Sequence, residues 1–295
     1  MSEFATIPKN LAPRIKSEYA QKIPKIIWQT MKTNEVPVFM KTYADSWIDL
    51  NPEYEYRFHD DHDIMNFLKK DFPDYLEGYK KLKYGASKAD LWRYLIIYKY
   101  GGVYADIDCK CIAPLKQWVN HESAFVTQLG TNKDICQWLI MSVAKNPIFL
   151  KAAKITLENS KKNNYKTAHY GFEFTNKKLG LNQNSPLLKF DHEVLGLSGP
   201  PVLQKAAEEC FKEGSIDNFL PYTQVVCVSG ATSCQMNGNV SHDSGDEEYK
   251  RSYKELKLNH YNTNLQRIKR RIGVFLKSLI YNLPVAKLGK LQVKD

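Results

Sequence analysis

The sequence GASKADLWRYLIIYKYGGVYADIDCKCIAP, residues 85–114, contains the clearest structural signals in the chain. Residues 86–100 are mostly good helix formers, and the pair Gly101-Gly102 predicts that a helix ends there, because glycine favours helix C-terminal caps. Apolar and polar residues then alternate over 103–108, which predicts a strand. Strand and helix patterns continue to alternate along the chain, so we expect an α/β domain with a largely parallel, Rossmann-like sheet.

The predicted strand carries two carboxylates, Asp106 and Asp108, on one face, since side chains two residues apart in a strand point the same way. Two such carboxylates can bind one hard cation, and Mn²⁺ and Mg²⁺ prefer oxygen ligands. A cation of this kind neutralises the charge that develops on a departing diphosphate. On the preceding helix, Asp90 and Arg93 are three residues apart and share a face. Taken alone, the two strand carboxylates also fit a pair of solvated acids.

The spacing of these residues resembles the signature of glycosyltransferase family 32, which is similar to a motif of the clostridial glucosylating toxins. The matching positions are Ser87-x-x-Asp90-x-x-Arg93-Tyr94, Tyr98-x-x-Gly101-Gly102-Val103-Tyr104 and Asp106-x-Asp108. The resemblance is specific over 85–115, weaker over 23–60 and thin beyond 130. It implies a GT-A fold, with a mixed, mostly parallel sheet flanked by helices, and sugar transfer from a nucleotide-diphosphate sugar with retention of configuration.

The resemblance also implies roles for single residues. Asp108 would bind a Mn²⁺ or Mg²⁺ ion that bridges the donor diphosphate, and Asp106 would help to position this metal while contacting the ribose and the donor sugar. Asp90 and Arg93 would hold the sugar hydroxyls and the reacting end of the donor, and Tyr104 would lie on or near the nucleotide. The predicted catalytic residues are therefore Asp90, Arg93 and Asp106.

Further site residues are predicted outside this stretch. Trp28, in a predicted buried strand over 23–28, either stacks on the nucleobase, as the resemblance implies, or is a core aromatic residue. Members of the family supply a His and a Ser-Trp pair late in the catalytic domain. The nearest matches here are His242 as a metal ligand and Ser252-Tyr253 as donor-binding residues, with Tyr where Trp is usual. A surface histidine is the alternative interpretation of His242.

Two other groups of potential ligands have simpler interpretations. Asp60, Asp61 and Asp63 precede or begin a predicted helix, where acidic residues cap the N-terminus and complement the helix dipole, so we do not predict a metal site there. The six cysteines are scattered, and no secretory signal precedes them, so we expect free thiols in a reducing compartment.

We divide the chain into an N-terminal arm that we expect to be loosely attached (1–22), a GT-A domain (23–255) and a basic helical tail (256–295). Within the domain, strands are predicted at 54–59 and 224–228, and helices at 36–50, 60–70, 199–212 and, interrupted at 146–147, over 135–161.

The basic charge of the chain is concentrated near its C-terminus. Residues 250–295 contain twelve Lys or Arg and two acidic residues, which accounts for the whole net charge of +10. A neutral catalytic body argues against nucleic acid as a partner. An apolar stripe along 264–283 predicts a basic amphipathic helix that either lies on an anionic membrane surface or packs on the domain.

The chain shows neither a signal peptide nor an apolar run of the ~18 residues that a membrane helix needs. We therefore expect a cytoplasmic protein, peripheral at the membrane surface if the tail binds there. The expected partners are a nucleotide-diphosphate sugar and a glycan, lipid-linked or protein acceptor. Two alternatives use the same residues, namely a metal-dependent nucleotide-sugar hydrolase and a non-catalytic, membrane-associated glycan-binding scaffold.

Overall fold

A computed structural model of the chain describes residues 4–117, 119–129, 135–162, 195–218, 223–227 and 234–236. The helices of this part are α1 (Val38–Leu50), α2 (Asp61–Asp71), α3 (Pro73–Lys81), α4 (Gly85–Tyr100), α5 (Pro147–Lys162) and α8 (Pro200–Lys212), with a 3₁₀ turn at Leu115–Gln117. Its strands are β1 (Phe4–Thr6), β2 (Asn10–Leu11), β3 (Ile26–Thr30), β4 (Glu35–Pro37), β5 (Glu55–His59), β6 (Gly102–Ala105), β7 (Cys109–Cys111), β8 (Phe125–Leu129), β9 (Leu139–Ser142), β10 (Thr223–Cys227) and β11 (Cys234–Met236).

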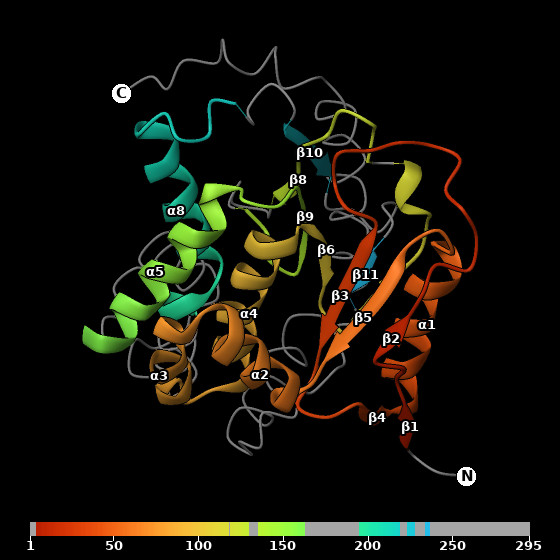
Figure 1. Cartoon of the computed structure of the whole chain (residues 1–295), viewed down its shortest axis with the longest axis horizontal. Helices are drawn as coiled ribbons and strands as arrows, with labels where there is room; N and C mark the ends of the chain where they lie inside the picture. The colour runs from red at the N-terminus through yellow and green to blue at the C-terminus, as the bar shows by residue number, and fades with distance from the viewer. Residues whose placement is uncertain are drawn as a thin grey trace, which may run out of the picture.

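The centre of the fold is a seven-stranded sheet in the order β10-β8-β9-β6-β3-β5-β2 (Figure 1). Strands β10, β8, β6, β3 and β5 run in one direction, whereas β9 and β2 run antiparallel to their neighbours. The sheet is therefore mixed and mostly parallel, and helices flank it. This confirms the predicted fold class, while the predicted C-terminal amphipathic helix lies outside the described residues.

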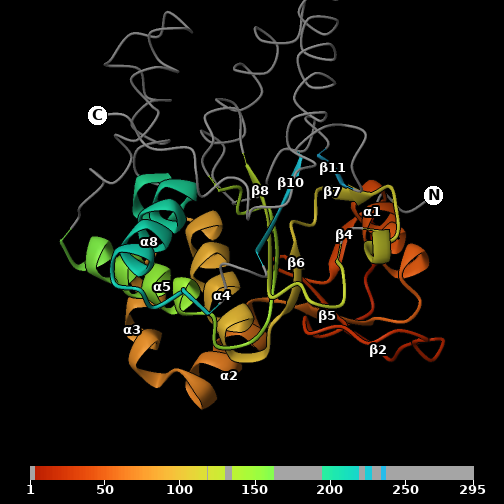
Figure 2. The same ribbon diagram turned by 90° about the horizontal axis from the view of Figure 1, so that it is seen from above.

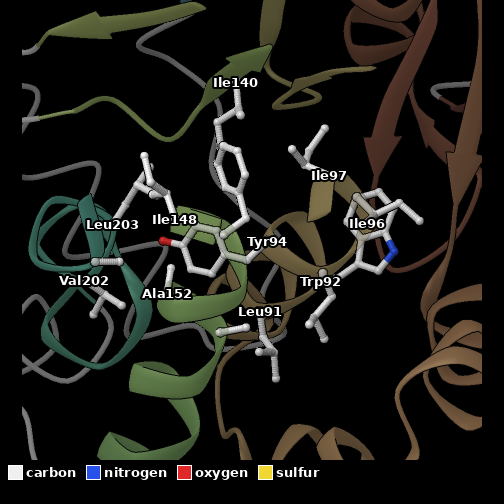
Figure 3. Packing of buried hydrophobic residues seen from close by; sticks show 14 of the residues in the cluster. Leu91, Trp92, Tyr94, Ile96, Ile97, Ile140, Ile148, Ala152, Val202 and Leu203 are labelled. Atoms are coloured by element: carbon white, nitrogen blue, oxygen red, sulfur yellow. The ribbon is translucent and has the colours of Figure 1, made fainter. Parts of the chain in front are cut away.

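Helices cover both faces of the sheet, so the fold has three layers (Figure 2). On one face α4 packs against α5 and α8 through apolar side chains that include Tyr94, Ala152 and Leu203 (Figure 3). On the other face Trp47 of α1 packs in a second cluster with Val103 of β6. Helix α4 is buried on nearly all sides, which explains why it shows no strong polar face in the sequence.

The Gly101-Gly102 pair joins α4 to β6 as predicted, and both residues adopt positive φ angles of 66° and 99°. A Cβ atom on Gly102 would lie 2.6 Å from the carbonyl oxygen of Ile26, and one on Gly101 would lie 2.7 Å from that of Ser142. Only glycine meets both demands, because other residues rarely adopt such φ angles and no real Cβ lies so close to a backbone oxygen. The pair therefore lets β6 enter the sheet directly beside β3.

Most of the predicted elements are found within two or three residues of their expected ends, including α1, α2, α8, β5 and β10. The prediction of helix over 135–161 is wrong in its first part, where Leu139–Ser142 form the buried strand β9. A short apolar run fits a buried strand as well as a helix, and here the open edges of β6 and β8 accept it as an antiparallel strand.

The N-terminal residues are bound more tightly than expected. Strand β1 pairs with β4, and β2 adds an edge strand to the central sheet beside β5. Between them Ile7 is fully buried and its backbone N–H donates to the carbonyl oxygen of Asn34 at 2.8 Å. The expectation of a loosely attached arm is therefore wrong for the residues from Phe4 to Leu11, whereas the boundary at residue 22 stays a prediction. Within the part of the chain that is described, no helix has the length and apolar character to cross a bilayer.

Candidate active site

The two aspartates lie just beyond the C-terminal end of β6. The strand ends at Ala105, where the backbone N–H of Asp106 donates to the carbonyl oxygen of Trp138 at 2.9 Å. The N–H of Cys109 then donates to the carbonyl oxygen of Asp106 at 3.0 Å, which closes a turn over 106–109. The predicted strand over 103–108 is thus too long by three residues. In open α/β sheets, ligands bind beyond the carboxyl ends of the parallel strands, which is where this turn lies.

Arg93 is the centre of a buried polar cluster beside this turn. Its Nη2 atom lies 3.1 Å from Oδ1 of Asp90, one helical turn away on α4, and 3.1 Å from Oδ1 of Asp106. Its Nη1 atom donates to the carbonyl oxygen of Gln137 at 2.8 Å, and its guanidinium carbon lies 4.4 Å from the centroid of the Tyr104 ring. One cation therefore joins the carboxylate of α4 to the carboxylate that follows β6.

Asp90 lies deeper than Asp106, the other carboxylate that contacts Arg93, with only 2% of its surface exposed. Its Oδ1 atom accepts a hydrogen bond from Nε2 of Gln137 at 2.9 Å, and its Oδ2 atom accepts one from Oγ of Ser198 at 2.7 Å. Burial raises the pKa of Asp90 to about 7, although Arg93 and both hydrogen-bond donors act in the opposite direction. Near neutral pH this carboxyl group can therefore hold or release a proton.

Arg93 itself stays charged. Burial lowers its pKa, but the neighbouring Asp106, Tyr104 and Asp90 outweigh this effect and the net direction is upward. Its Nε atom is buried and has no hydrogen-bond partner among the described residues. Buried polar groups are nearly always hydrogen-bonded, and the exceptions concentrate at functional sites. The Nε–H group of Arg93 is therefore one donor that these residues leave unused.

Tyr104 fixes one side of Asp106. The Tyr104 hydroxyl donates to Oδ1 of Asp106 at 2.5 Å, and the ring is enclosed by Arg93 and by an edge contact with Trp92. Within the described part of the chain, the hydrogen bonds and ion pairs of this carboxylate all fall on Oδ1, and 19% of the side chain is exposed. Oδ2 is thus available to a ligand. These contacts make Tyr104 a positioning residue for Asp106, and its predicted contact with the nucleotide stays a prediction.

The donor set at this turn fits the predicted metal. Asp106 and Asp108 supply carboxylate oxygens from a single turn, and both Mn²⁺ and Mg²⁺ prefer such ligands. Asp108 is 2% exposed, so it faces the protein interior rather than bulk water. The other residues predicted for the metal and the donor, His242, Ser252 and Tyr253, lie outside the described residues.

Trp28 pairs with Tyr104 in the sheet, but its indole ring is directed toward the start of β6, away from the aspartates. Its indole N–H donates to the carbonyl oxygen of Gly101 at 3.0 Å, and its ring stacks on Tyr100 with 5.7 Å between centroids. Only 1% of the residue is exposed. This environment favours the alternative of a core aromatic residue, and stacking on a nucleobase stays a prediction.

Gln137, Ser198 and Tyr94 belong to the cluster but were not predicted as site residues. The hydroxyl of Tyr94 lies 2.6 Å from Oε1 of Gln137 and 2.7 Å from the carbonyl oxygen of Ser198, so these three residues support Asp90 together. Ser198 directly precedes the predicted Gly199-Pro200 helix start, which is a usable sequence signal. For Gln137 the only signal is a polar residue inside an apolar run.

The acidic cluster at the start of α2 is a helix cap, as predicted. Asp60 and Asp63 form a capping box, in which each side chain accepts from the other's backbone N–H. Ligand atoms of Asp60, His62 and Asp63 come within 4.8 Å of one another, which is the geometry of a possible cation site. However, Nζ of Lys9 lies 2.5 Å from Asp60 and 2.7 Å from Asp63, so a cationic side chain already pairs with both carboxylates of this cluster.

Comparisons with known proteins agree with the resemblance inferred from the motif. Residues 37–125 match a family model described as a glycosyltransferase sugar-binding region containing a DXD motif. This range includes the two aspartates of the turn and the α4 residues that contact them. The prediction of a family 32-type glycosyltransferase motif is confirmed.

Several curated relatives are fungal mannosyltransferases. Over 97 residues the chain is 44% identical to inositol phosphoceramide mannosyltransferase 3 of Schizosaccharomyces pombe, which covers 33% of this chain and 27% of the relative. Over 136 residues it is 36% identical to the mannosyl phosphorylinositol ceramide synthase SUR1 of Saccharomyces cerevisiae, covering 45% of this chain and 35% of the relative. The matches thus span about a third of the length of these relatives. A solved PaToxG glycosyltransferase is 16% identical with a TM-score of 0.47, covering 67% of this chain and 74% of that one.

Proposed function

We propose that this protein is a Mn²⁺- or Mg²⁺-dependent glycosyltransferase that moves a sugar from a nucleotide-diphosphate sugar to a hydroxyl group of a glycoconjugate, with retention of configuration. The observation that carries the proposal is the buried Arg93, held between Asp90 and Asp106 at the carboxyl edge of the sheet. Burying such charges is costly, and clusters with perturbed pKa values mark functional sites.

Each residue has a separate task in this proposal. Asp106 and Asp108 hold the metal, which supplies positive charge to the departing diphosphate. Arg93 offers its Nε–H group to an oxygen of the donor, and its permanent charge favours an oxygen on which negative charge grows. Asp90 accepts a hydrogen bond from a sugar hydroxyl when it is ionised. Attack of the acceptor on the same face as the departing diphosphate requires no nucleophile from the protein.

The names of the relatives suggest the donor and the acceptor. We infer that the donor carries mannose, because the names of both relatives refer to a mannosyl group. The two names also contain inositol phosphoceramide and phosphorylinositol ceramide, so an inositol phosphoceramide is the first acceptor to test, followed by glycans. Residues 264–283 would then hold the protein at an anionic membrane surface, and the cytoplasmic location stays part of the proposal.

The proposal is tested by incubating the purified protein with nucleotide-diphosphate hexoses, Mn²⁺ and an acceptor panel. We expect an α-mannosylated acceptor whose anomeric configuration, read by NMR, matches that of the donor. Free sugar in every condition would instead support the hydrolase alternative, and donor binding without turnover would support the scaffold. Either result, or an inverted product, overturns the proposal. Asp74→Asn, which changes an exposed carboxylate on α3, is the matched control for substitutions in the site.

A further inference from the structure

A single polar residue of β3 reaches the Asp106–Asp108 turn from an apolar face of the sheet. Gln29 is fully buried. Side chains two residues apart in a strand share a face, so Gln29 points to the same side as Ile27, which packs in the second apolar cluster with Tyr56 and Ala105. A buried amide in such surroundings is costly unless its oxygen and its nitrogen are both hydrogen-bonded. The partners of Gln29 therefore indicate its role.

The amide of Gln29 joins β5 to the turn. Its Oε1 atom accepts a hydrogen bond from the hydroxyl of Tyr56 at 2.8 Å, and its Nε2 atom donates to the backbone carbonyl oxygen of Asp106 at 3.2 Å. This orientation of the amide is fixed, because a carbonyl oxygen can only accept and the amide nitrogen must therefore face Asp106. Burial raises the pKa of Tyr56 well above its ordinary value, so the hydroxyl keeps the proton that it donates to Gln29.

The backbone of Asp106 is held by three hydrogen bonds. Its N–H group donates to the carbonyl oxygen of Trp138 at 2.9 Å, and its carbonyl oxygen accepts from the N–H group of Cys109 at 3.0 Å as well as from Gln29. Two of these bonds join backbone groups, so substitution of a side chain leaves them in place. The bond from Gln29 is the one that comes from a side chain, and it connects the turn to the neighbouring strand β3.

The Asp106 carbonyl group belongs to the first peptide unit between the two aspartates. Because a peptide unit is planar, the direction of this carbonyl group also sets the direction in which the chain continues toward Asp108. The side chain of Asp106 is fixed separately, through the bonds of Oδ1 to Tyr104 and Arg93. Mn²⁺ and Mg²⁺ bind in a defined geometry, so two carboxylates serve one ion only at the right spacing. The bond from Gln29 acts on that spacing.

We propose that Gln29 is a positioning residue for the metal site, whose bond to the Asp106 carbonyl oxygen sets the spacing of the Asp106 and Asp108 carboxylates. The inference rests on the proposed function for the identity of the ligand, a divalent cation, but not for the effect on the turn. Gln29 acts through the backbone of Asp106 and not by contact with the cation. Its loss should therefore weaken metal binding and leave the reacting groups in place.

Three variants separate this role from a contribution to stability. Gln29→Met keeps the length of the side chain but removes both hydrogen bonds, whereas Tyr56→Phe leaves the bond to Asp106 in place. The double variant Gln29→Met/Tyr56→Phe removes the hydroxyl that Gln29→Met leaves buried without a partner, so it should have a higher Tm than Gln29→Met.

The first measurement is calorimetry of Mn²⁺ binding to each full-length protein. Loss of a residue that orients a metal ligand weakens metal binding by 10–100-fold, so we expect about tenfold weaker binding in Gln29→Met and in the double variant. Tyr56→Phe should stay within about twofold of the wild type, although its Tm falls. Excess Mn²⁺ should restore much of the turnover of Gln29→Met, because weak binding is overcome by concentration and a misfolded site is not. Wild-type Mn²⁺ affinity in Gln29→Met, or an equal loss in Tyr56→Phe, overturns the proposal.

A second measurement, on the metal-free protein, does not depend on the proposed function. Cys109 is the one cysteine of the chain that follows an aspartate, so labelling with ¹⁵N-cysteine and ¹³C-carbonyl aspartate selects its amide in an NMR spectrum. This amide donates to the same carbonyl oxygen as Gln29. Its hydrogen exchange should be at least ~10-fold faster in Gln29→Met than in Tyr56→Phe, because the turn opens more easily without the bond. Equal exchange in the two variants overturns the proposal, whereas a wild type that binds no Mn²⁺ overturns the proposed function and leaves the exchange rates to decide the role of Gln29.

Discussion

Substitution of Arg93 by lysine tests whether the planar guanidinium group, rather than its charge alone, organises the site. Arg93 uses Nη1 for the carbonyl oxygen of Gln137 and Nη2 for both Asp90 and Asp106, while its flat face lies on Tyr104. A lysine keeps the charge but concentrates its donors on one atom at the end of a flexible chain. It cannot reach the backbone carbonyl and both carboxylates together.

The magnitude follows from the contacts that are lost. A hydrogen bond to a charged group contributes about 1.5–3 kcal/mol, and the substitution should remove one or two of these. We therefore expect Arg93→Lys to lower the free energy of unfolding by roughly 2–5 kcal/mol. Turnover should fall by at least ~10²-fold, because a preorganised donor is lost from the reacting centre.

The assay combines urea unfolding of the metal-free protein with kcat and KM for the nucleotide sugar. Arg57→Lys is the matched control, because Arg57 lies half exposed on β5 and pairs with Glu55 at 2.7 Å. Exposed pairs contribute about 0–1 kcal/mol, so this variant should behave nearly as the wild type. An Arg93→Lys protein that unfolds and turns over like the Arg57→Lys control would refute the reasoning.

Four further predictions follow from the site and its support. Asp108→Asn should lower turnover by at least ~10²–10³-fold without unfolding the protein. A chelator should abolish the activity of the wild type, and added Mn²⁺ or Mg²⁺ should restore it. Full activity in the presence of chelator would contradict the proposed metal site. In the metal-free protein, the free energy of unfolding in urea should fall by up to about 4 kcal/mol between pH 4 and 7 and then level off. The reason is that native Asp90 keeps a proton that the unfolded chain releases over this range. Asp90→Asn should remove this dependence on pH. Gly102→Ala should lower Tm strongly or prevent folding, since its Cβ would meet a backbone oxygen at 2.6 Å, and an unchanged Tm would disprove this account. Trp28→Phe should lower Tm by losing its bond to Gly101 while leaving donor affinity unchanged; weaker donor binding at an unchanged Tm would restore the stacking role.

The sequence was sufficient to predict the local part of the site. Helix α4, the glycine pair and β6 form one continuous segment. Asp90, Arg93 and Asp106 therefore lie within 17 residues of sequence, on or just after these adjacent elements. The three-residue spacing on α4 correctly predicts that Asp90 and Arg93 face the same way. The contact between Arg93 and Asp106 follows from the same segment, because a helix that folds back along its next strand brings both residues to one edge.

What the sequence did not predict depends on contacts between distant segments. Ser198 is 108 residues from Asp90, and its position depends on how α8 packs on α4 and α5. Gln137 reaches the site because β9 enters the sheet antiparallel to β6, and the apolar run that forms β9 does not distinguish strand from helix. The register of β7 and β11, in which Cys111 lies opposite Cys234, has no local signal either, because strand register depends on contacts with the partner strand.

The charges of the cluster favour the proposed divalent cation at this turn. When ionised, Asp90, Asp106 and Asp108 carry three negative charges in and beside this buried cluster, and Arg93 balances one of them. A protein interior tolerates uncompensated charge poorly, and Asp90 responds by holding its proton up to a pH of about 7. A divalent cation at the turn would compensate the remaining two charges and favour the ionised form of Asp90. Metal binding should therefore release a proton near neutral pH, and calorimetry of Mn²⁺ binding in buffers of different ionisation enthalpy measures that release. The wild type should release this proton at pH 6.5 whereas Asp90→Asn should not, and equal release from both proteins would show that Asp90 does not respond to the metal.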